Sequence, residues 1–262
     1  MRSEAGLALA VFLAGAWAQS PPIRPAFEAF EVATIKPTAP DNHGGRFITM
    51  QGAHRFIAKD YSLKALIGAA YNLTPPSISG GPAWIDSDHF DLLAETPGQV
   101  RPELDDQMAM LRKLLAERFS LTFHREPKEM SVYTLSVTAG GPKLQSPQTP
   151  DGPPRLVNVV YPDRILLPAR NATMAQFASM MQRAVVDRPV MDKTGLSGNY
   201  DFNLEWTPDE TQFAGQLPPV TGEITKPDLF AALRQQLGLK LEAARGTVQV
   251  LVIDRAERPS DN

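Results

Sequence analysis

The segment IDSDHFD gathers four groups that could do chemistry: Asp86, Asp88, His89 and Asp91. Carboxylates and an imidazole bind divalent metals or exchange protons with a substrate. A zinc site, however, needs three or four ligands that converge on one point. The alternative is a polar loop that leads into a strand, with Phe90 facing inward and its neighbours solvated. We therefore expect neither a metal nor another cofactor here.

One acidic residue of this segment has a counterpart later in the chain, since Phe90-Asp91 corresponds to Tyr200-Asp201. Two carboxylates facing one cleft at roughly 5–10 Å could serve as the acid and base of a hydrolase. Asp91, Asp201 and His89 are therefore the catalytic candidates. Alternatively, each aspartate caps a local turn or pairs with a nearby Arg or Lys. Because the pair occupies equivalent places, we favour the structural role.

Three further side chains are candidates for binding a ligand. Trp84 and Trp206 could each stack on a sugar ring, although a large residue at the edge of a core would look the same in the sequence. Lys193, which is followed by Thr194, could contribute to an anion site.

Several classes of function lack the residues that they need. The chain has no G-x-x-x-x-G-K-[ST], G-x-G-x-x-G, H-E-x-x-H or G-x-S-x-G sequence. It has no cysteine, and therefore no thiolate nucleophile or cysteine-bound metal. A net charge of −3 argues against a broad basic surface for nucleic acid. These absences favour a non-catalytic protein.

The N-terminal residues have the pattern of a secretory signal. Arg2 is followed by an apolar run over residues 6–16 and by Ala16-Trp17-Ala18, which offers small residues to a signal peptidase. The run is too short to span a bilayer. We predict a signal peptide over residues 1–18, cleavage near Ala18, no transmembrane segment in the mature chain, and a periplasmic or extracellular protein.

The elements that must position these residues occur twice. Arg46 and Arg55 recur as Arg155 and Arg164, at one spacing of 109 residues (155 − 46 and 164 − 55). The same order holds for two apolar helix patterns: Leu63, Leu66, Ile67 and Ala70 correspond to Met174, Phe177, Ala178 and Met181, and Leu111, Leu115 and Phe119 to Leu229, Leu233 and Leu237. Ordered matches with small changes of spacing indicate a duplicated domain.

Each half contains short strands around two amphipathic helices. We expect the first helix to begin at Leu63 behind a cap at Asp60 or Ser62. Two hairpins should end the halves, one around Pro127 between strands 121–124 and 132–137, and one across Arg245-Gly246.

The fold class that follows is α+β, with two tandem modules that are each an antiparallel or mixed sheet with two helices packed on it. We place the first module at residues 22–140, a Pro/Gly-rich linker at 141–154, and the second module at 155–262.

Long segments over nearly all of the mature chain resemble an uncharacterised exported family of soil acidobacteria: FEVATIKP, GGPAWIDSDHFDLLAE, MLRKLLAERFSLTFHREPKEMSVYTLSV, VMDKTGLSGNYDFNLEWTPD and LFAALRQQLGLKLEAARGTVQVLVIDRAERP. This resemblance implies a domain of unknown function. Residues 229–248 are also similar to the short N-terminal domain of secretins and TonB-dependent receptors, which implies an interaction module.

Three functions are compatible with these observations. The one that we favour is a non-catalytic exported protein whose tandem modules bind an envelope protein or another component of the cell envelope. The alternatives are a hydrolase that acts on cell-wall or other polymer at a site between the modules, and a binder of a small ligand or glycan. No nucleic acid partner is expected.

Overall fold

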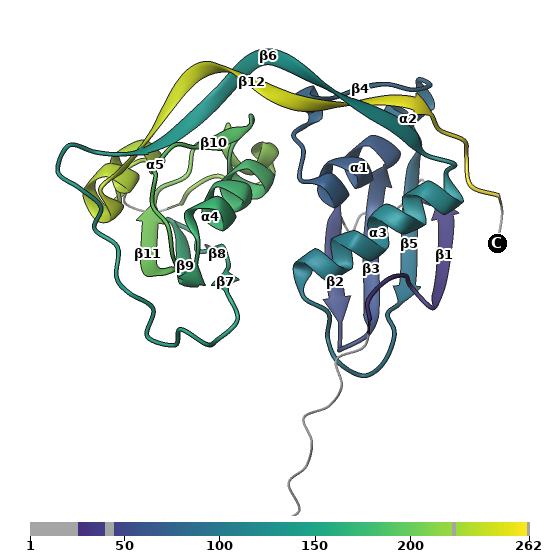
Figure 1. Cartoon of the computed structure of the whole chain (residues 1–262), viewed down its shortest axis with the longest axis horizontal. Helices are drawn as coiled ribbons and strands as arrows, with labels where there is room; N and C mark the ends of the chain where they lie inside the picture. The colour runs from purple at the N-terminus through teal and green to yellow at the C-terminus, as the bar shows by residue number, and fades with distance from the viewer. Residues whose placement is uncertain (1–25, 40–44, 222–223, 261–262) are drawn as a thin grey trace, which may run out of the picture.

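The computed structural model describes residues 26–39, 45–221 and 224–260, and the predicted signal peptide lies outside them. Among the described residues the fold is α+β, with three four-stranded sheets and five α-helices. Figure 1 shows two lobes side by side, connected by a long two-stranded ribbon that runs over both. The predicted fold class is confirmed at this level.

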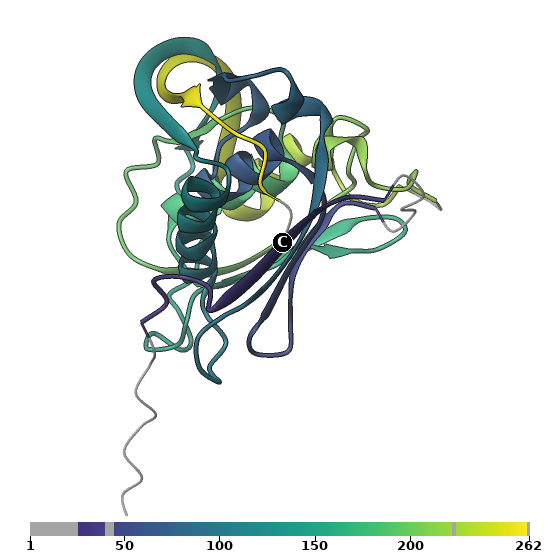
Figure 2. The ribbon, with the colours of Figure 1, turned by 90° about the vertical axis from the view of Figure 1, so that its right-hand side faces the viewer.

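Lobe 1 contains an antiparallel sheet in the order β1-β5-β3-β2. Its strands are β1 (Val32–Pro37), β2 (Phe47–Gln51), β3 (Arg55–Ser62) and β5 (His89–Glu95). Its other elements are α1 (Leu63–Tyr71), the 3₁₀ turn η1 (Pro75–Ser77), β4 (Ile78–Gly80), α2 (Trp84–Ser87) and α3 (Leu104–Arg118). Seen from the side of this lobe, α3 lies against one face of the sheet (Figure 2).

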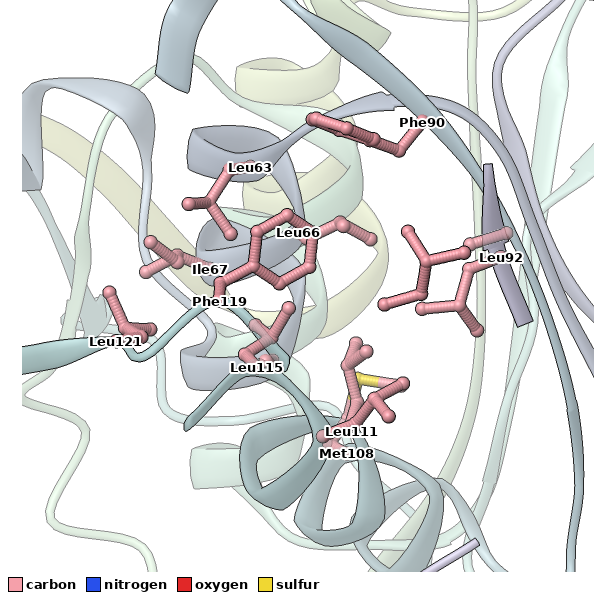
Figure 3. Packing of buried hydrophobic residues seen from close by; sticks show 14 of the residues in the cluster. Leu63, Leu66, Ile67, Phe90, Leu92, Met108, Leu111, Leu115, Phe119 and Leu121 are labelled. Carbon is pink, nitrogen blue, oxygen red and sulfur yellow. The ribbon is translucent and has the colours of Figure 1, made fainter. Parts of the chain in front are cut away.

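The apolar stripe predicted for the first helix builds the core of lobe 1. Leu63, Leu66 and Ile67 of α1 are fully buried and point toward Leu111 and Leu115 of α3 (Figure 3). Burying a leucine side chain stabilises the fold by roughly 1.5–3 kcal/mol. The pairing of these two stripes therefore fixes both helices on the sheet.

The start of α1 is set by Ser62, whose Oγ accepts a hydrogen bond from Ala65 N at 3.3 Å. Asp60, the other predicted cap, instead has a left-handed backbone, with φ 59°, at an irregularity in the pairing of β3 with β5. The helix ends at Asn72, which is also left-handed.

Lobe 2 contains a second antiparallel sheet, in which β11 and β7 flank β9 and β8 also pairs with β9. Its strands are β7 (Arg155–Leu156), β8 (Val159–Val160), β9 (Ile165–Ala172) and β11 (Tyr200–Trp206). Its other elements are α4 (Met174–Met180) with the π-helical turn η2 (Met181–Val185), β10 (Val190–Asp192), the 3₁₀ turn η3 (Gln212–Gly215), and α5 (Leu229–Ala232) with the π-helical turn η4 (Leu233–Leu237).

The two hairpins predicted at the ends of the halves are wrong. Residues 122–137 form one strand, β6 (Thr122–Val137), and residues 239–255 form another, β12 (Leu239–Arg255). The two strands pair antiparallel along nearly their whole length. Pro127 is tolerated within β6 because, in the part of the chain that the structure describes, β6 pairs there with β12 on one side and leaves its other side unpaired. Gly246 makes no turn; a Cβ there would lie 2.7 Å from Met191 Sδ, so the glycine permits close packing.

Each long strand begins in one lobe and completes the core of the other. Leu135, near the end of β6, is fully buried in the core of lobe 2. Leu251, near the end of β12, is fully buried in the core of lobe 1. The third sheet has the order β10-β6-β12-β4, with the two long strands at its centre. Each lobe adds one short parallel strand to the long strand that ends in it: β10 pairs with β6 in lobe 2, and β4 pairs with β12 in lobe 1.

The predicted linker, residues 141–154, lies along lobe 2. Lys143 N donates to Leu237 O at 2.8 Å, and Gln145 exchanges two backbone hydrogen bonds with Asp201. The lobes also meet directly, where Asn72 Nδ2 donates to Ser179 Oγ at 2.7 Å. The division of the chain into independently folding modules stays a prediction.

Candidate functional site

Asp201 is held by the backbone on both of its oxygens. Oδ1 accepts from Asn171 N at 2.7 Å and Oδ2 accepts from Gln148 N at 3.0 Å, and the residue is 4% exposed. Asn171 donates from a left-handed position, with φ 50°. The hydrogen bonds from Asn171 and then Gln148 hold the pKa of Asp201 below its usual range, with the charge of Arg170 adding to this. The ionised form of the carboxylate is favoured, and one backbone bond on each oxygen fixes its position, which suits a structural anchor.

Asp91 has a comparable role in lobe 1 with a different set of donors. Oδ1 accepts from Thr38 Oγ1 at 3.0 Å and from Asp60 N at 3.1 Å, and Oδ2 accepts from Lys59 Nζ at 2.7 Å. Burial opposes ionisation of Asp91, but these three hydrogen bonds outweigh it and lower the pKa. Asp91 and Asp201 are therefore held in different sheets by bonds within their own lobes.

The polar groups of IDSDHFD do not converge. His89 Nδ1 lies 2.6 Å from Asp60 Oδ1, Asp88 pairs with Arg258 at 2.9 Å, and Asp86 pairs with Lys64 at 3.1 Å. Residues 26–39, 45–221 and 224–260 contain no group of three or more His, Asp or Glu side chains that could hold a metal. Each group is engaged by a separate partner.

The two tryptophans are covered to different degrees. Trp206 is 0% exposed and donates from Nε1 to Gln212 Oε1 at 2.7 Å, so its ring cannot stack on a sugar. Trp84 is half-buried; the Phe119 ring is stacked with it at 6.5 Å, and the Arg258 guanidinium lies 5.1 Å from its ring centroid. Trp206 therefore offers no free face, and Trp84 is left partly exposed.

Lys193 is exposed at the end of β10, and its backbone N–H donates to Leu135 O at 2.8 Å. Next to it, Asp192 Oδ1 accepts from Thr194 N and Oγ1, at 2.9 and 2.7 Å. The segment is thus a closed turn.

A polar cavity of about 370 Å³ lies on lobe 2, beside Asp201. Its walls come from the 141–154 segment, from β9 and β11, and from the end of η4. They comprise Lys143, Gln145, Gln148, Arg170, Asp201, Phe202, Asn203, Gln236 and Leu237. Asp201 is the one sequence-predicted candidate that the structure brings to this cavity.

Two cations line the cavity, and neither has a carboxylate within ion-pairing distance in the described part of the chain. Arg170 Nη1 donates to Ala169 O at 2.7 Å and to Phe202 O at 3.0 Å, and Lys143 Nζ donates to Gln235 O at 2.8 Å. Sequence reasoning missed both cations. A signal for Arg170 existed, since Asn171 after it corresponds to Asp60 at the spacing that relates Leu63 to Met174 (171 − 60 and 174 − 63), but nothing marked Lys143 within the supposed linker.

A family model described as a protein of unknown function, DUF3738, matches residues 64–256. The chain belongs to the DUF3738 family. The match begins within α1 and ends after β12, so it covers lobe 2 and both exchanged strands of this DUF3738 protein and leaves β1, β2 and β3 of lobe 1 outside. The predicted membership of a family of unknown function is confirmed, while the secretin-like similarity stays a prediction.

Comparison of the DUF3738 chain with curated proteins and with solved structures found no match. No helix in the described part of the chain has the length and apolarity needed to cross a membrane.

Proposed function

We propose that this DUF3738 chain is an exported, non-catalytic binding protein whose ligand site is the polar cavity on lobe 2. The observation that carries the proposal is the state of Asp201, the acidic group in that cavity. Both of its oxygens accept backbone hydrogen bonds, and its pKa is lowered. A general base works best with a pKa near the working pH, and the bonds to Asp201 move its pKa further below that range. What the cavity offers instead is a set of fixed hydrogen-bonding groups.

The alternative of a hydrolase with a site between the modules has less support. It requires Asp91 and Asp201 to face one cleft, whereas each is bonded within its own sheet. Export is supported by the N-terminal pattern and by the family resemblance, and the absence of cysteine is compatible with either side of the membrane.

We also infer that the two lobes descend from one duplicated unit. The strongest support is a repeated local arrangement. Asp60 and Asn171, both left-handed, each donate a backbone N–H to Oδ1 of the aspartate on the neighbouring strand. Two residues later, Ser62 and Thr173 each cap a helix through the side-chain oxygen.

The strand pairing supports the same inference. Lys36 of β1 pairs with Asp91, and Gln145 pairs with Asp201, so the supposed linker contains the counterpart of β1. Each lobe also contributes one short parallel strand, β4 or β10, to the long strand that ends there. The ancestral unit would then be a homodimer that exchanged its last strand.

Binding without turnover can be tested on the chain from residue 26, with a panel of neutral sugars, sugar acids, organic acids and peptides. We expect saturable stabilisation by one class of compound, which is recovered chemically unchanged. Hydrolysis that is lost in Asp201→Asn would overturn the non-catalytic assignment. Export can be tested by fractionating cells that express the full chain. We expect the protein outside the cytoplasm, with a mature N-terminus near Gln19.

The duplication can be tested by cutting the chain. Residues 26–140 and 141–262, expressed together as separate polypeptides, should assemble one to one because each half supplies a core strand to the other. Size-exclusion chromatography of the mixture checks this. Two folded monomers that do not associate would show that β6 and β12 are not needed across the lobes.

A further inference from the structure

We propose that the lobe 2 cavity binds a small anion through a carboxylate or phosphate group, with Arg170 and Lys143 as the contacts of that group. This inference rests on the proposed function, because it assigns a ligand class to the same cavity.

The first step is a comparison of the cations that stand beside the two repeated aspartates. In lobe 1, Lys59 Nζ is bonded to Asp91 at 2.7 Å, so cation and anion neutralise each other. In lobe 2, Arg170 precedes left-handed Asn171 as Lys59 precedes left-handed Asp60. Asp201 is nevertheless bonded to backbone N–H groups instead, which leaves the guanidinium without a carboxylate at ion-pairing distance among the described residues.

The second step is the count of remaining donors. Arg170 bonds protein atoms of the described chain through Nη1, and both acceptors are backbone carbonyls. Nε and the second terminal nitrogen keep their N–H groups, which is the fork that binds a carboxylate or phosphate with two parallel hydrogen bonds. Lys143 Nζ uses one contact, to Gln235 O, and an ammonium has three donors.

The third step is the remainder of the lining. Gln145, Gln148 and Asn203 are exposed around the cavity and bring neutral amide groups, and Phe202 and Leu237 contribute apolar surface. Two cations and one ionised aspartate leave the cavity with one net positive charge. This favours a small anion that carries hydroxyl or carbonyl groups over a polyanion, which needs a wider basic surface.

The test is titration of the purified chain from residue 26 with glucuronate, citrate and inorganic phosphate, with glucose as the neutral probe. Isothermal calorimetry measures affinity, and ¹⁵N-resolved NMR shows whether the shifted amides surround the cavity. We expect at least one of the anions to bind saturably and to shift the amides of Gln148 and Phe202, and glucose to bind more weakly. Binding of glucuronate or citrate but not of phosphate would identify the ligand group as a carboxylate. Binding of phosphate alone would identify it as a phosphate group.

Arg170→Gln should weaken the binding by about 10- to 100-fold, the loss expected for charge-assisted hydrogen bonds. Lys143→Ala should weaken it by less, and it disturbs no core residue, so it decides the matter if Arg170→Gln does not fold. Lys193→Ala, which removes an exposed cation of lobe 2 outside the cavity, is the matched control and should bind as the parent chain does.

The inference is overturned if none of the three anions binds, or if Lys143→Ala and Lys193→Ala bind alike. Binding of a neutral sugar in the cavity without any anion would overturn the ligand class and leave the proposed binding function standing. Turnover of a bound compound would instead overturn the proposed function.

Discussion

The two lobes place an aspartate at the same position of the same arrangement and then treat it differently. In lobe 1, Asp91 accepts from the Lys59 and Thr38 side chains and from one backbone N–H, whereas in lobe 2 Asp201 accepts from two backbone N–H groups. In lobe 1 the ion pair with Asp91 engages Lys59. In lobe 2 the backbone bonds to Asp201 leave Arg170 available at a cavity. Two lobes with the same local arrangement can thus differ in whether a cation beside the aspartate is left at a cavity.

The ends of the last helices show a second difference. Ser120 and Gly238 are both left-handed, with φ 48° and 65°, just before β6 and β12 begin. At Gly238 the carbonyl of Gly141 occupies the place that a Cβ would take. Lobe 2 therefore packs the start of the 141–154 segment against the end of its last helix, where lobe 1 has room for the Ser120 side chain.

The largest effects are expected where the exchanged strands enter the cores. Leu251→Ala in lobe 1 and Leu135→Ala in lobe 2 should each lower the free energy of unfolding by about 2–5 kcal/mol, because each removes a fully buried side chain. In chains from residue 26, Trp84 and Trp206 are the two tryptophans, so Trp206→Phe and Trp84→Phe leave one reporter in each lobe. Both reporters should unfold in one transition for either leucine variant.

The matched control for these variants is Thr247→Ala, an exposed position in the middle of the ribbon, which should change stability by less than about 0.5 kcal/mol. If Leu251→Ala shifts the transition of Trp84 and leaves that of Trp206 in place, the lobes are independent units, and the comparison of two mutually completed cores fails.

A smaller effect is expected from exchanging the left-handed residues. Gly238→Ser should destabilise the chain by about 1–3 kcal/mol, because it combines left-handed strain with a contact against Gly141. Ser120→Gly is the reverse change in lobe 1. It should alter the free energy of unfolding much less, because lobe 1 already accommodates a serine side chain at this left-handed position. Chemical denaturation of the two variants checks this; equal losses would remove the proposed difference in packing.

The aspartates should differ in the same sense. Asp201→Asn should cost about 1–3 kcal/mol, because an amide presents its NH₂ group to one of two buried backbone donors. Asp91→Asn should cost less, since Asp91 is partly exposed and an exposed ion pair contributes little. Denaturation at neutral pH gives both values.

The pH dependence follows from the direction of the pKa shifts. A carboxylate whose folded pKa is lowered stabilises the protein above its unfolded pKa of about 3.9, and this stabilisation is lost as the pH falls through the folded pKa. The difference between the parent chain and Asp201→Asn should therefore be full at pH 6 and shrink below about pH 4. A difference that grows in acid would contradict the ionised anchor.

The local patterns predicted the elements better than the connections. The helix from Leu63 and its Ser62 cap follow from spacing and side-chain chemistry, which act over one or two turns. Pro127 and Gly246 were misread as turns, because a residue that permits a turn also permits a free edge or a close approach. That choice depends on the opposite lobe, which no local pattern contains.

The candidate site was predicted only in part. The sequence correspondence of Asp91 and Asp201 predicted a structural role for both, and their hydrogen bonds are compatible with that role. Lys143 could not be found in this way, since its place in the cavity depends on how the Pro-rich segment packs against β11 and the end of η4. The tryptophans were weighed equally in the sequence, and only burial separates Trp206 from Trp84.

The smallest change in stability is expected at Trp84. The Arg258 guanidinium lies over the Trp84 ring, whereas Trp206 is enclosed in the core of lobe 2. Arg258→Ala removes the guanidinium 5.1 Å from the ring centroid and its hydrogen bond to Asp88, so we expect a loss of about 0.5–1 kcal/mol. Loss of the guanidinium would expose more of the Trp84 ring to a sugar. We expect no glycan to quench Trp84 fluorescence in the parent chain. Quenching there by a neutral glycan would mean that Arg258 yields to a ligand and that lobe 1 also carries a site.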